Sequence, residues 1–170
     1  MKQRYQYKLP QKSDYPNNFK ILDQPGLSAE YHQLLEASAS AYFETKGPAK
    51  WLFMKRFQMV IKYLEKVGPV KQLLDAGTGI GFFLPTLAQS ATHVWAVDYA
   101  QHTLKYAKAM CKKLKIKNVD FKQGDLMKLP FKEKQFDVVI ALSILEHILP
   151  KNLPKVIRHF KRVLKPNGYL

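Results

Sequence analysis

Three glycines at alternate positions are the residues of this chain with the clearest chemical meaning. Gly77, Gly79 and Gly81 follow an apolar run that ends at Asp75, in the segment LLDAGTGIGFFLP. Glycine at this density lets the backbone approach another molecule closely. The segment therefore predicts a binding loop, and its ligand is a phosphate, a dinucleotide or a molecule without phosphate.

The spacing of the glycines argues against both common phosphate-binding loops. A Walker-type loop needs Lys and then Ser or Thr after its last glycine, but two phenylalanines follow Gly81. The dinucleotide pattern G-x-G-x-x-G fits from neither Gly77 nor Gly79. The pattern is D-x-G-x-G-x-G, and Asp75 suits a ligand of ammonium or sulfonium character better than a pyrophosphate.

A second acidic residue, Asp98, ends the apolar segment VWAVD. A carboxylate has two acceptor oxygens, so Asp98 can accept hydrogen bonds from both hydroxyls of a ribose. Dinucleotide-binding folds also carry such an acid. The glycine spacing, and not Asp98, therefore discriminates between the two kinds of ligand.

The elements that must position these residues alternate between strand and helix from residue 70 onward. The run FDVVIALS is apolar at consecutive positions, which is typical of a parallel strand covered on both faces. This alternation predicts an α/β fold with a parallel sheet and right-handed crossovers. Strands are predicted at 70–76, 93–98, within 118–125 and at 136–143, and helices at 82–90, 100–116 and 152–168.

Residues 1–69 are predicted to form a separate N-terminal arm and helical cap in front of the 70–170 core. Ser28 is a plausible N-cap for a first helix, and Pro48 suits the first turn of a second helix that ends before Gly68. Trp51 is expected to pack against the sheet, and Tyr42 or Phe43 is a weaker candidate to line a substrate pocket. The apolar stripe of the second helix is Trp51, Met54, Phe57, Ile61 and Leu64.

The net charge of +15 raises the question of an anionic partner such as nucleic acid. The basic residues are 24 Lys and only 4 Arg, whereas Arg is preferred where phosphates and bases are read. Lys-rich solvent-facing helices, such as the face with Lys105, Lys108 and Lys112, are the favoured explanation. The denser basic stripe between residues 151 and 165 leaves an anionic partner open.

The bulk composition is typical of a cytoplasmic protein. The one cysteine, Cys111, falls on the apolar side of its predicted helix and cannot form an intrachain disulfide. The N-terminus lacks the apolar stretch of a secretory signal. The longest apolar run, at residues 138–145, is far shorter than the ~20 residues of a membrane span.

Five segments together resemble class I S-adenosylmethionine (SAM)-dependent methyltransferases. They are LLDAGTGIG, VWAVDYA, FKQGDLMKLPF, FDVVIALSILEHI and LKPNGYL, in the family's order and spacing. The chain looks most like the group of ubiquinone/menaquinone-type and other small-molecule methyltransferases. The resemblance covers residues 70–170 and implies a Rossmann-like sheet that binds SAM.

The resemblance also implies roles for individual residues. The three-glycine loop would pass under the amino-acid part of SAM, and Asp75 would help to hold that end. Asp98 would take the ribose hydroxyls. Tyr99 would lie beside the adenine, Asp125 would accept from its amino group and Leu126 would pack nearby. Plain packing for Tyr99 and a turn-forming role for Asp125 remain open alternatives.

Methyl transfer from a sulfonium is an in-line displacement, for which the protein mainly supplies orientation and exclusion of water. In the family, residues Ala141 to Ser143 would border the methyl group. His147 is the titratable candidate for a general base, with a structural or substrate-lining role as the alternative. The segment around Glu146 lacks the sequence signatures of three other classes of methyltransferase. These classes methylate amino groups of nucleic-acid bases, C5 of pyrimidines, or catechols with the help of a metal ion. A small-molecule acceptor is favoured, and an RNA methyltransferase or a non-catalytic SAM-binding domain are the alternatives.

The family fold has seven strands, whereas this chain ends at Leu170, where the fifth strand is expected to begin. The sequence therefore predicts a truncated sheet whose fourth strand is an open edge. An open edge invites pairing with another strand. Self-association, or a covering segment from the N-terminal arm, is the expected consequence.

Overall fold

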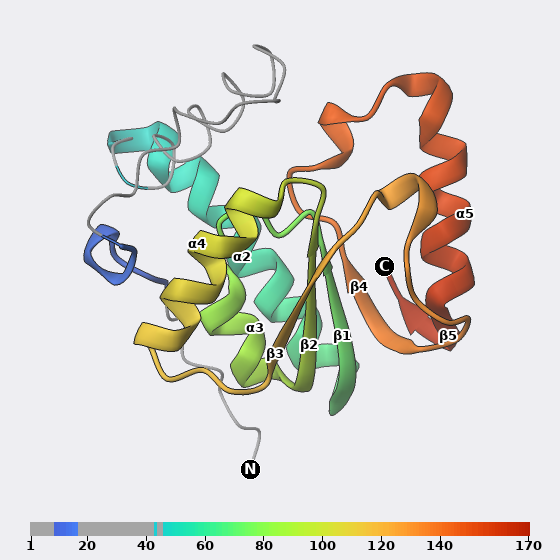
Figure 1. The fold of residues 1–170 in the computed structure, drawn as a ribbon, viewed down its shortest axis with the longest axis horizontal. Coiled ribbons are helices and arrows are strands. Elements are labelled where there is room, and N and C mark those ends of the chain that lie inside the picture. The colour runs from blue at the N-terminus through green and yellow to red at the C-terminus, as the bar shows by residue number, and fades with distance from the viewer. Residues whose placement is uncertain (1–8, 17–42, 44–45) are drawn as a thin grey trace.

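The computed structural model describes residues 9–16, 43 and 46–170, and Figure 1 shows their arrangement. The strands are β1 (Val70–Ala76), β2 (Ala91–Asp98), β3 (Val119–Gln123), β4 (Phe136–Ile140) and β5 (Leu164–Tyr169). The α-helices are α2 (Gly47–Val67), α3 (Leu84–Ser90), α4 (Gln101–Lys113) and α5 (Leu153–Val163). Short 3-10 turns are η1 (Lys12–Asp14), η2 (Leu126–Lys128), η3 (Leu145–His147) and η4 (Pro150–Asn152).

The five strands form one sheet in the order β3-β2-β1-β4-β5, with every neighbouring pair parallel. In the register, Asp75 of β1 lies beside Ala96 of β2 and Ile140 of β4. The predicted α/β class and parallel sheet are therefore confirmed. Because the strands are parallel, the segments that follow β1, β2, β3 and β4 all leave from the same edge of the sheet.

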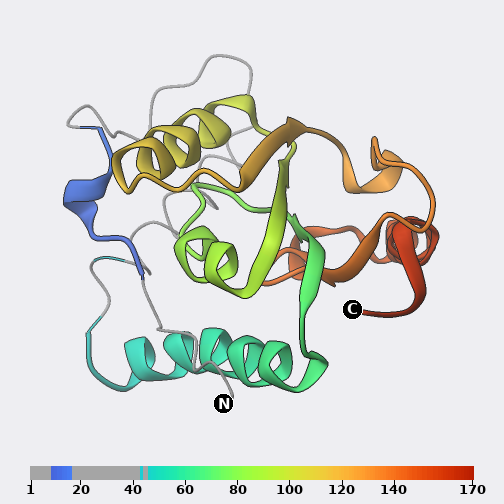
Figure 2. The same ribbon diagram turned by 90° about the horizontal axis from the view of Figure 1, so that it is seen from below.

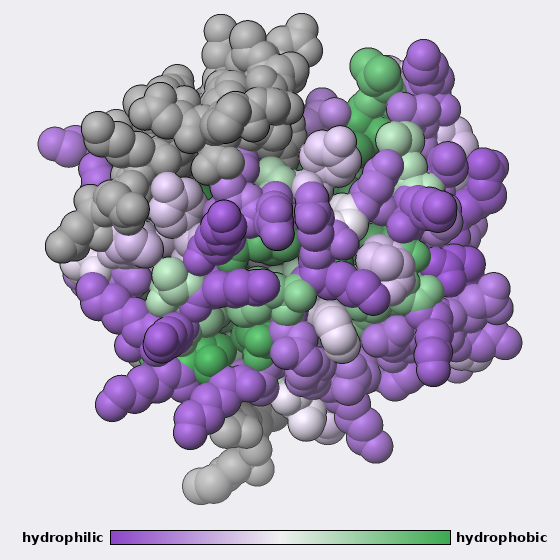
Figure 3. All heavy atoms as spheres, in the orientation of Figure 1, coloured by the Kyte–Doolittle hydropathy of each residue, from purple (hydrophilic) through white to green (hydrophobic). Residues whose placement is uncertain are grey.

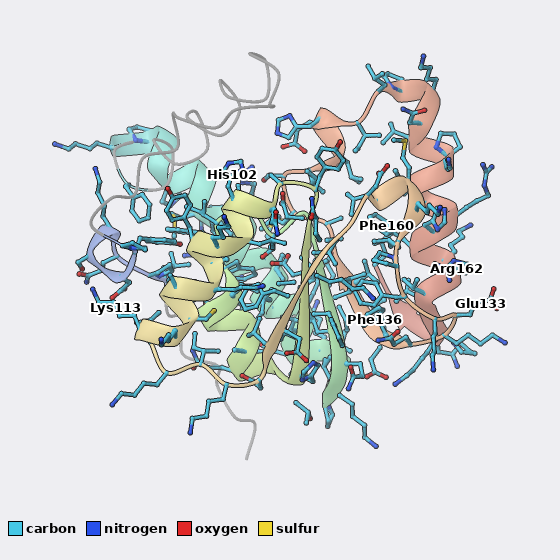
Figure 4. The ribbon with its side chains drawn as sticks, viewed as in Figure 1. His102, Lys113, Glu133, Phe136, Phe160 and Arg162 are labelled. Carbon is cyan, nitrogen blue, oxygen red and sulfur yellow. The ribbon has the colours of Figure 1, made fainter. Side chains whose placement is uncertain are left out.

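Adjacent residues of each central strand point to opposite faces of the sheet and enter two separate cores. Leu73 and Val138 join the core on one face, while Leu74 and Val139 join the core on the other. Figure 2 shows α2, α3 and α4 on the first face and α5 on the second. Both faces are thus covered, as the consecutive apolar residues of β4 predict. In Figure 4, Phe136 and Phe160 lie between β4 and α5.

The α2 helix starts and ends as its sequence predicts, with Pro48 in its first turn and Gly68 at φ +86° just beyond it. Phe57, Ile61 and Leu64 are buried against the sheet. The expectation that Trp51 packs in this core is wrong, because its side chain is 62% exposed. Across the described ranges, no helix has both the length and the apolar character required to cross a bilayer.

Part of the N-terminal arm packs onto this same face. The Tyr15 side chain is 2% exposed, and its ring meets that of Phe43 edge-on with centroids 5.7 Å apart. The ring of Phe43 meets that of Phe82, next to the glycine loop, at 5.6 Å. Phe43 is thus a packing residue. The predicted first helix from Ser28, together with Tyr42, lies outside the described residues.

The chain after Val163 differs from its prediction, because it forms a fifth strand. The helix predicted at 152–168 ends at Val163, and Leu164 adopts extended backbone angles. β5 pairs with β4 in parallel, with Phe136 opposite Leu164. The prediction of an open fourth strand is therefore wrong, and self-association no longer follows from it.

A carboxylate fastens β5 and β1 to β4. Asp137 of β4 accepts hydrogen bonds from Lys165 Nζ at 2.7 Å and from the backbone N–H of Gln72 at 2.7 Å. Burial raises the pKa of Asp137, but these hydrogen bonds outweigh burial and leave the pKa below its usual value. Asp137 therefore favours the present order of the three strands.

The solvent-facing sides of the helices are basic, as predicted. On α4, Lys105, Lys108 and Lys112 are exposed while Ala107 and Cys111 are buried. Figure 3 shows hydrophilic side chains over most of the visible face, including the areas over α4 and α5. Burial raises the pKa of the Cys111 thiol to about 12, so this cysteine is a packing residue and not a nucleophile.

Candidate functional site

The candidate site lies where β1, β2 and β4 end, at the upper edge of the sheet in Figure 1. The glycine loop follows β1, Asp98 is the last residue of β2, and Ala141 follows β4 directly. In the order β3-β2-β1-β4-β5, strands β2 and β3 lie on one side of β1, and β4 and β5 lie on the other side. The direction in which successive strands are added to the sheet therefore switches between β1 and β4. Such a switch point is where open α/β sheets bind their ligands.

The glycine loop has a backbone that other residues adopt with difficulty. Gly77, Gly79 and Gly81 have φ angles of +84°, +55° and +76°. A Cβ on Gly77 would lie 2.6 Å from Cγ1 of Ile144, and one on Gly81 would lie 2.8 Å from Cβ of Ala107. Within the part of the chain that the structure describes, a Cβ on Gly79 would meet no atom within 4 Å. The loop is thus packed at both ends and borders open space at its middle.

The loop is fastened to the end of β2 through its backbone. The N–H groups of Gly77 and Thr78 both donate to the carbonyl oxygen of Val97, at 2.8 and 2.9 Å. The N–H of Gly81 donates to the carbonyl oxygen of Thr78 at 2.9 Å, which closes the turn before α3. The position of the loop is therefore set by the sheet.

Asp98 connects the glycine loop to the start of α4. Its Oδ2 accepts from the N–H of Gly79 at 2.7 Å, and its Oδ1 accepts from the N–H of Ala100 at 2.9 Å. The hydroxyl oxygen of Thr103 lies 3.2 Å from Oδ1 and is closer to the carbonyl oxygen of Ala100, to which it donates at 2.7 Å. The residue is 5% exposed. The carboxylate thus faces the middle of the loop, where a ribose has to lie if Asp98 is to hold it.

Asp75 is the second buried carboxyl group at this edge, with 6% of the residue exposed. The hydroxyl of Thr78 donates to its Oδ2 at 2.6 Å. Burial raises the pKa of Asp75 to about 6; the Thr78 hydrogen bond opposes this rise, and the charge of Asp98 adds to it. A cation brought to this position would stabilise the charged carboxylate.

Asp75 makes the stability of the fold depend on pH. Its pKa in the folded state, about 6, lies above the ordinary value of 3.8 expected for the unfolded chain. The folded state holds this proton more tightly, so the stabilisation is complete below pH 3.8 and is lost as pH rises through about 6. Relative to Asp75→Asn, the native chain should lose about 3 kcal/mol of unfolding free energy across this interval.

Urea unfolding of the native chain and Asp75→Asn at a series of pH values measures this difference. Asp137→Asn is the matched control, because the lowered pKa of Asp137 gives the opposite sign, with stability lost as pH falls. A difference between the native chain and Asp75→Asn that is flat with pH would contradict the raised pKa of the buried Asp75.

The predicted adenine side is formed by segments that follow β2 and β3. Tyr99 is 64% exposed, and its carbonyl oxygen accepts from Gln123 Nε2 at 3.0 Å. Leu126 is buried. The side chain of Asp125 accepts from the N–H of Met127 at 2.7 Å and caps η2. Asp125 therefore has the turn-forming contact that the sequence left open as an alternative.

The segment after β4 meets the N-terminal helix α2. Ser143 has φ +57°, and its hydroxyl oxygen accepts from Nη1 of Arg56. Ala141 is half-buried. His147, the candidate base, is exposed in η3, and its N–H donates to the carbonyl oxygen of Ile144 at 3.0 Å. The structure thus places Ala141, Ser143 and His147 in one segment.

Sequence reasoning missed four residues that support this site: Arg56, Thr78, Thr103 and Gly124. Thr78 and Thr103 contact the two predicted carboxylates, and their positions inside the loop and one turn into α4 were the available signal. A Cβ on Gly124 would lie 2.9 Å from Cδ of Pro130, which explains the glycine before Asp125. Arg56 lies 87 residues from its partner, so local sequence carries no signal for it.

A cavity of about 430 Å³ opens beside the segment after β4, between this strand and α2. Its lining is almost wholly apolar. It includes Ala141, which the family resemblance implies would border the methyl group. The main lining residues are Val60, Tyr63, Leu64, Val138, Leu142 and Leu145.

Two relatives illustrate the sequence similarity. A probable S-adenosylmethionine-dependent methyltransferase from Mycolicibacterium smegmatis is 27% identical over 116 residues, which cover 68% of this chain and 42% of the relative. The demethylmenaquinone methyltransferase of Lactococcus lactis is 35% identical over 116 residues, which cover 63% and 44%. This chain thus spans less than half the length of these two relatives.

Solved structures share the fold. The PH0226 protein from Pyrococcus horikoshii OT3 has a TM-score of 0.67 and 27% identity, covering 84% of this chain and 65% of that one. The protein of the DhpI–SAH complex has a TM-score of 0.62 at 22% identity, covering 80% and 63%. A family model described as a methyltransferase domain matches residues 74–170, more than half of the chain. The chain therefore belongs to the methyltransferase domain family.

Proposed function

We propose that this protein is a SAM-dependent methyltransferase that transfers a methyl group directly to a small molecule. The observation that carries the proposal is the pair of buried carboxyl groups, Asp75 and Asp98, on either side of the glycine loop at the switch point of the sheet. The family match and the SAM-dependent relatives support the same conclusion.

The residues at this edge fit the parts of SAM. The open space beside Gly79 accommodates a ligand that passes close to the backbone. Asp98 supplies carboxylate oxygens for ribose hydroxyls. Its hydrogen bond from the Gly79 N–H puts the carboxylate next to this open space. Asp75 supplies an acid whose charged form a sulfonium or ammonium group favours.

On the adenine side, we assign Tyr99 to the face of the ring and Leu126 to the apolar wall. The high exposure of Tyr99 and the burial of Leu126 suit these two roles. Asp125 is assigned to the adenine amino group. Because its Oδ1 already accepts from Met127, this role needs the other oxygen of the carboxylate.

SAM, when bound, supplies an activated methyl group together with its leaving group. The residues of the chain then have to orient the acceptor and exclude water. We assign Ala141 to Ser143 to the border of the methyl group, and the hydrogen bond from Arg56 to Ser143 supports the position of this segment. His147 is the proposed base for an acceptor that arrives protonated. In that case His147→Gln should lower kcat and change its pH profile while leaving SAM affinity unchanged.

The acceptor is best matched by an apolar small molecule. The apolar cavity of about 430 Å³ includes Ala141 and Leu142, so an acceptor bound there would lie beside the proposed methyl group. One relative is a demethylmenaquinone methyltransferase. Residues 1–69 then serve as the cap of the acceptor site and residues 70–170 as the SAM-binding core. The single, buried cysteine fits a cytoplasmic location.

A methyl-transfer assay tests this function. The chain is incubated with methyl-labelled SAM and, in parallel, with lipid, quinone and RNA extracts, and Asp98→Ala is the negative control. We expect label in the lipid or quinone fraction with the native chain only. Label in RNA would make the chain an RNA methyltransferase. SAM binding without label in any fraction would make it a non-catalytic SAM-binding domain.

A further inference from the structure

The outer side of α2 carries exposed apolar side chains, which distinguishes it from the other helices. Trp51, Met59 and Tyr63 are 62%, 57% and 63% exposed. They are separated by eight and four residues, so they lie within about 120° of one another around the helix. Among the described side chains, α4 and α5 carry no exposed large apolar residue. Figure 2 shows α2 at one end of its layer of helices, with α3 between it and α4.

Lysines are interleaved with these apolar residues. Lys55 Nζ lies 4.8 Å from the ring centroid of Trp51, and Lys66 Nζ lies 5.6 Å from that of Tyr63. Lys62 is exposed on the same side. This surface of α2 is called here the α2 outer face, defined by Trp51, Lys55, Met59, Lys62, Tyr63 and Lys66.

Bilayer surfaces favour this combination of side chains. Trp and Tyr rings settle at the level of the lipid headgroups, and lysines are attracted to anionic lipids. We propose that the α2 outer face docks this protein on the surface of an anionic phospholipid bilayer, with α2 lying along the membrane. The exposed side chain of Met59 is an apolar group that a bilayer accommodates.

Nucleic acid is the less suitable partner for this face. Its cations are all lysines, whereas planar recognition of phosphates and bases favours arginine. Two of its lysines already lie over aromatic rings that a base would need for stacking. A bilayer surface can contact the aromatic side chains and the lysines in their present arrangement.

Docking through this face would place the apolar cavity behind α2, with one side of the cavity near the bilayer surface. Tyr63 belongs to the α2 outer face and also lines the cavity, together with Val60 and Leu64 from the inner side of the same helix. An apolar acceptor dissolved in the membrane could then reach Ala141 past α2. This last step rests on the proposed function, whereas docking itself does not.

Tryptophan fluorescence tests the docking. The chain has two tryptophans, so Trp95→Phe leaves Trp51 as the only reporter. We expect its emission to shift to the blue with vesicles of phosphatidylcholine and phosphatidylglycerol, and not with phosphatidylcholine alone. If Trp95→Phe does not fold, the single variant Trp51→Phe, which keeps Trp95, tests the same point. It should show no vesicle-induced shift.

A charge-matched pair of variants locates the docking surface. Lys55→Glu/Lys62→Glu/Lys66→Glu changes the α2 outer face, and Lys105→Glu/Lys108→Glu/Lys112→Glu makes the same charge change on α4. In co-sedimentation with the anionic vesicles, we expect the α2 variant to bind at least about tenfold more weakly than the α4 variant. Equal losses, no vesicle binding by the native chain, or RNA binding with an unshifted Trp51 would each overturn the proposal.

Calorimetric titration with SAM separates this inference from the proposed function. The α2 variant should keep the native affinity for SAM, because its three lysines lie away from the glycine loop. Vesicle binding without SAM binding leaves the docking intact and refutes the proposed function. SAM binding without vesicle binding refutes the docking and leaves the function intact.

Discussion

Replacing Asp98 with alanine should weaken SAM binding at least about a hundredfold, because hydrogen bonds to a charged group contribute about 1.5–3 kcal/mol each and two are lost. The substitution also removes the acceptor for the N–H groups of Gly79 and Ala100, so the loop and the start of α4 lose their common partner. Isothermal titration calorimetry measures the change in dissociation constant.

Two variants serve as controls for Asp98→Ala. Asp98→Asn keeps one acceptor oxygen and should fall between the native chain and the alanine variant. Asp120→Ala removes an exposed carboxylate of β3 that pairs with His93 at 3.3 Å, away from the loop, and should bind SAM like the native chain. Native affinity in Asp98→Ala would exclude Asp98 from the binding site.

Replacing Gly77 with alanine should destabilise the fold by about 2–5 kcal/mol, which combines the left-handed backbone penalty with the cost of overpacking. Its φ is +84°, and the new Cβ would lie 2.6 and 2.9 Å from Cγ1 and Cβ of Ile144. Neither atom is the flexible end of a side chain, so the segment after β4 has to move. Urea unfolding measures the loss.

Gly79→Ala is the matched comparison for Gly77→Ala. Its φ of +55° is also left-handed, but a Cβ at this position would meet no atom of the described residues within 4 Å. Gly79→Ala should cost only about 1–2 kcal/mol of stability. Its main effect should be weaker SAM binding, because the side chain of the new alanine enters the space assigned to SAM. Similar destabilisation by both variants would contradict the packing of Gly77 against Ile144.

The parts of the fold that follow from local sequence were predicted well. β1 coincides with the predicted strand at 70–76 because a short apolar run meets a glycine turn. The exposed lysines of α4 and the buried Cys111 follow from helical periodicity. The family resemblance assigned the glycine loop, Asp75 and Asp98 to one ligand, and in the structure they lie together where β1 and β2 end.

Two errors have a physical cause. Val156, Phe160 and Leu164 keep a helical spacing, so local periodicity extends the helix beyond Val163, whereas pairing with β4 converts Leu164 onward into a strand. Trp51 continues the apolar stripe in sequence. Trp51 precedes Phe57 by six residues, so the two side chains point in directions about 120° apart around the helix. Trp51 therefore lies on the outer face while Phe57 is buried.

The contacts that complete the site could not be predicted, because they join distant segments. Arg56 and Ser143 meet only once α2 has packed on the sheet. The apolar cavity likewise needs α2, β4 and β5 in place before it exists. Local patterns therefore predicted the glycine loop and the two acids beside it, whereas the Arg56 contact and the apolar cavity required the tertiary structure.

Calorimetric titration of the native chain with SAM, and in parallel with NADH, measures which kind of ligand the D-x-G-x-G-x-G loop binds. We expect saturable one-to-one binding of SAM with a dissociation constant roughly in the micromolar range, and no measurable binding of NADH. Tighter binding of NADH, or no heat with SAM from a folded chain, would contradict the assignment of the D-x-G-x-G-x-G loop to SAM.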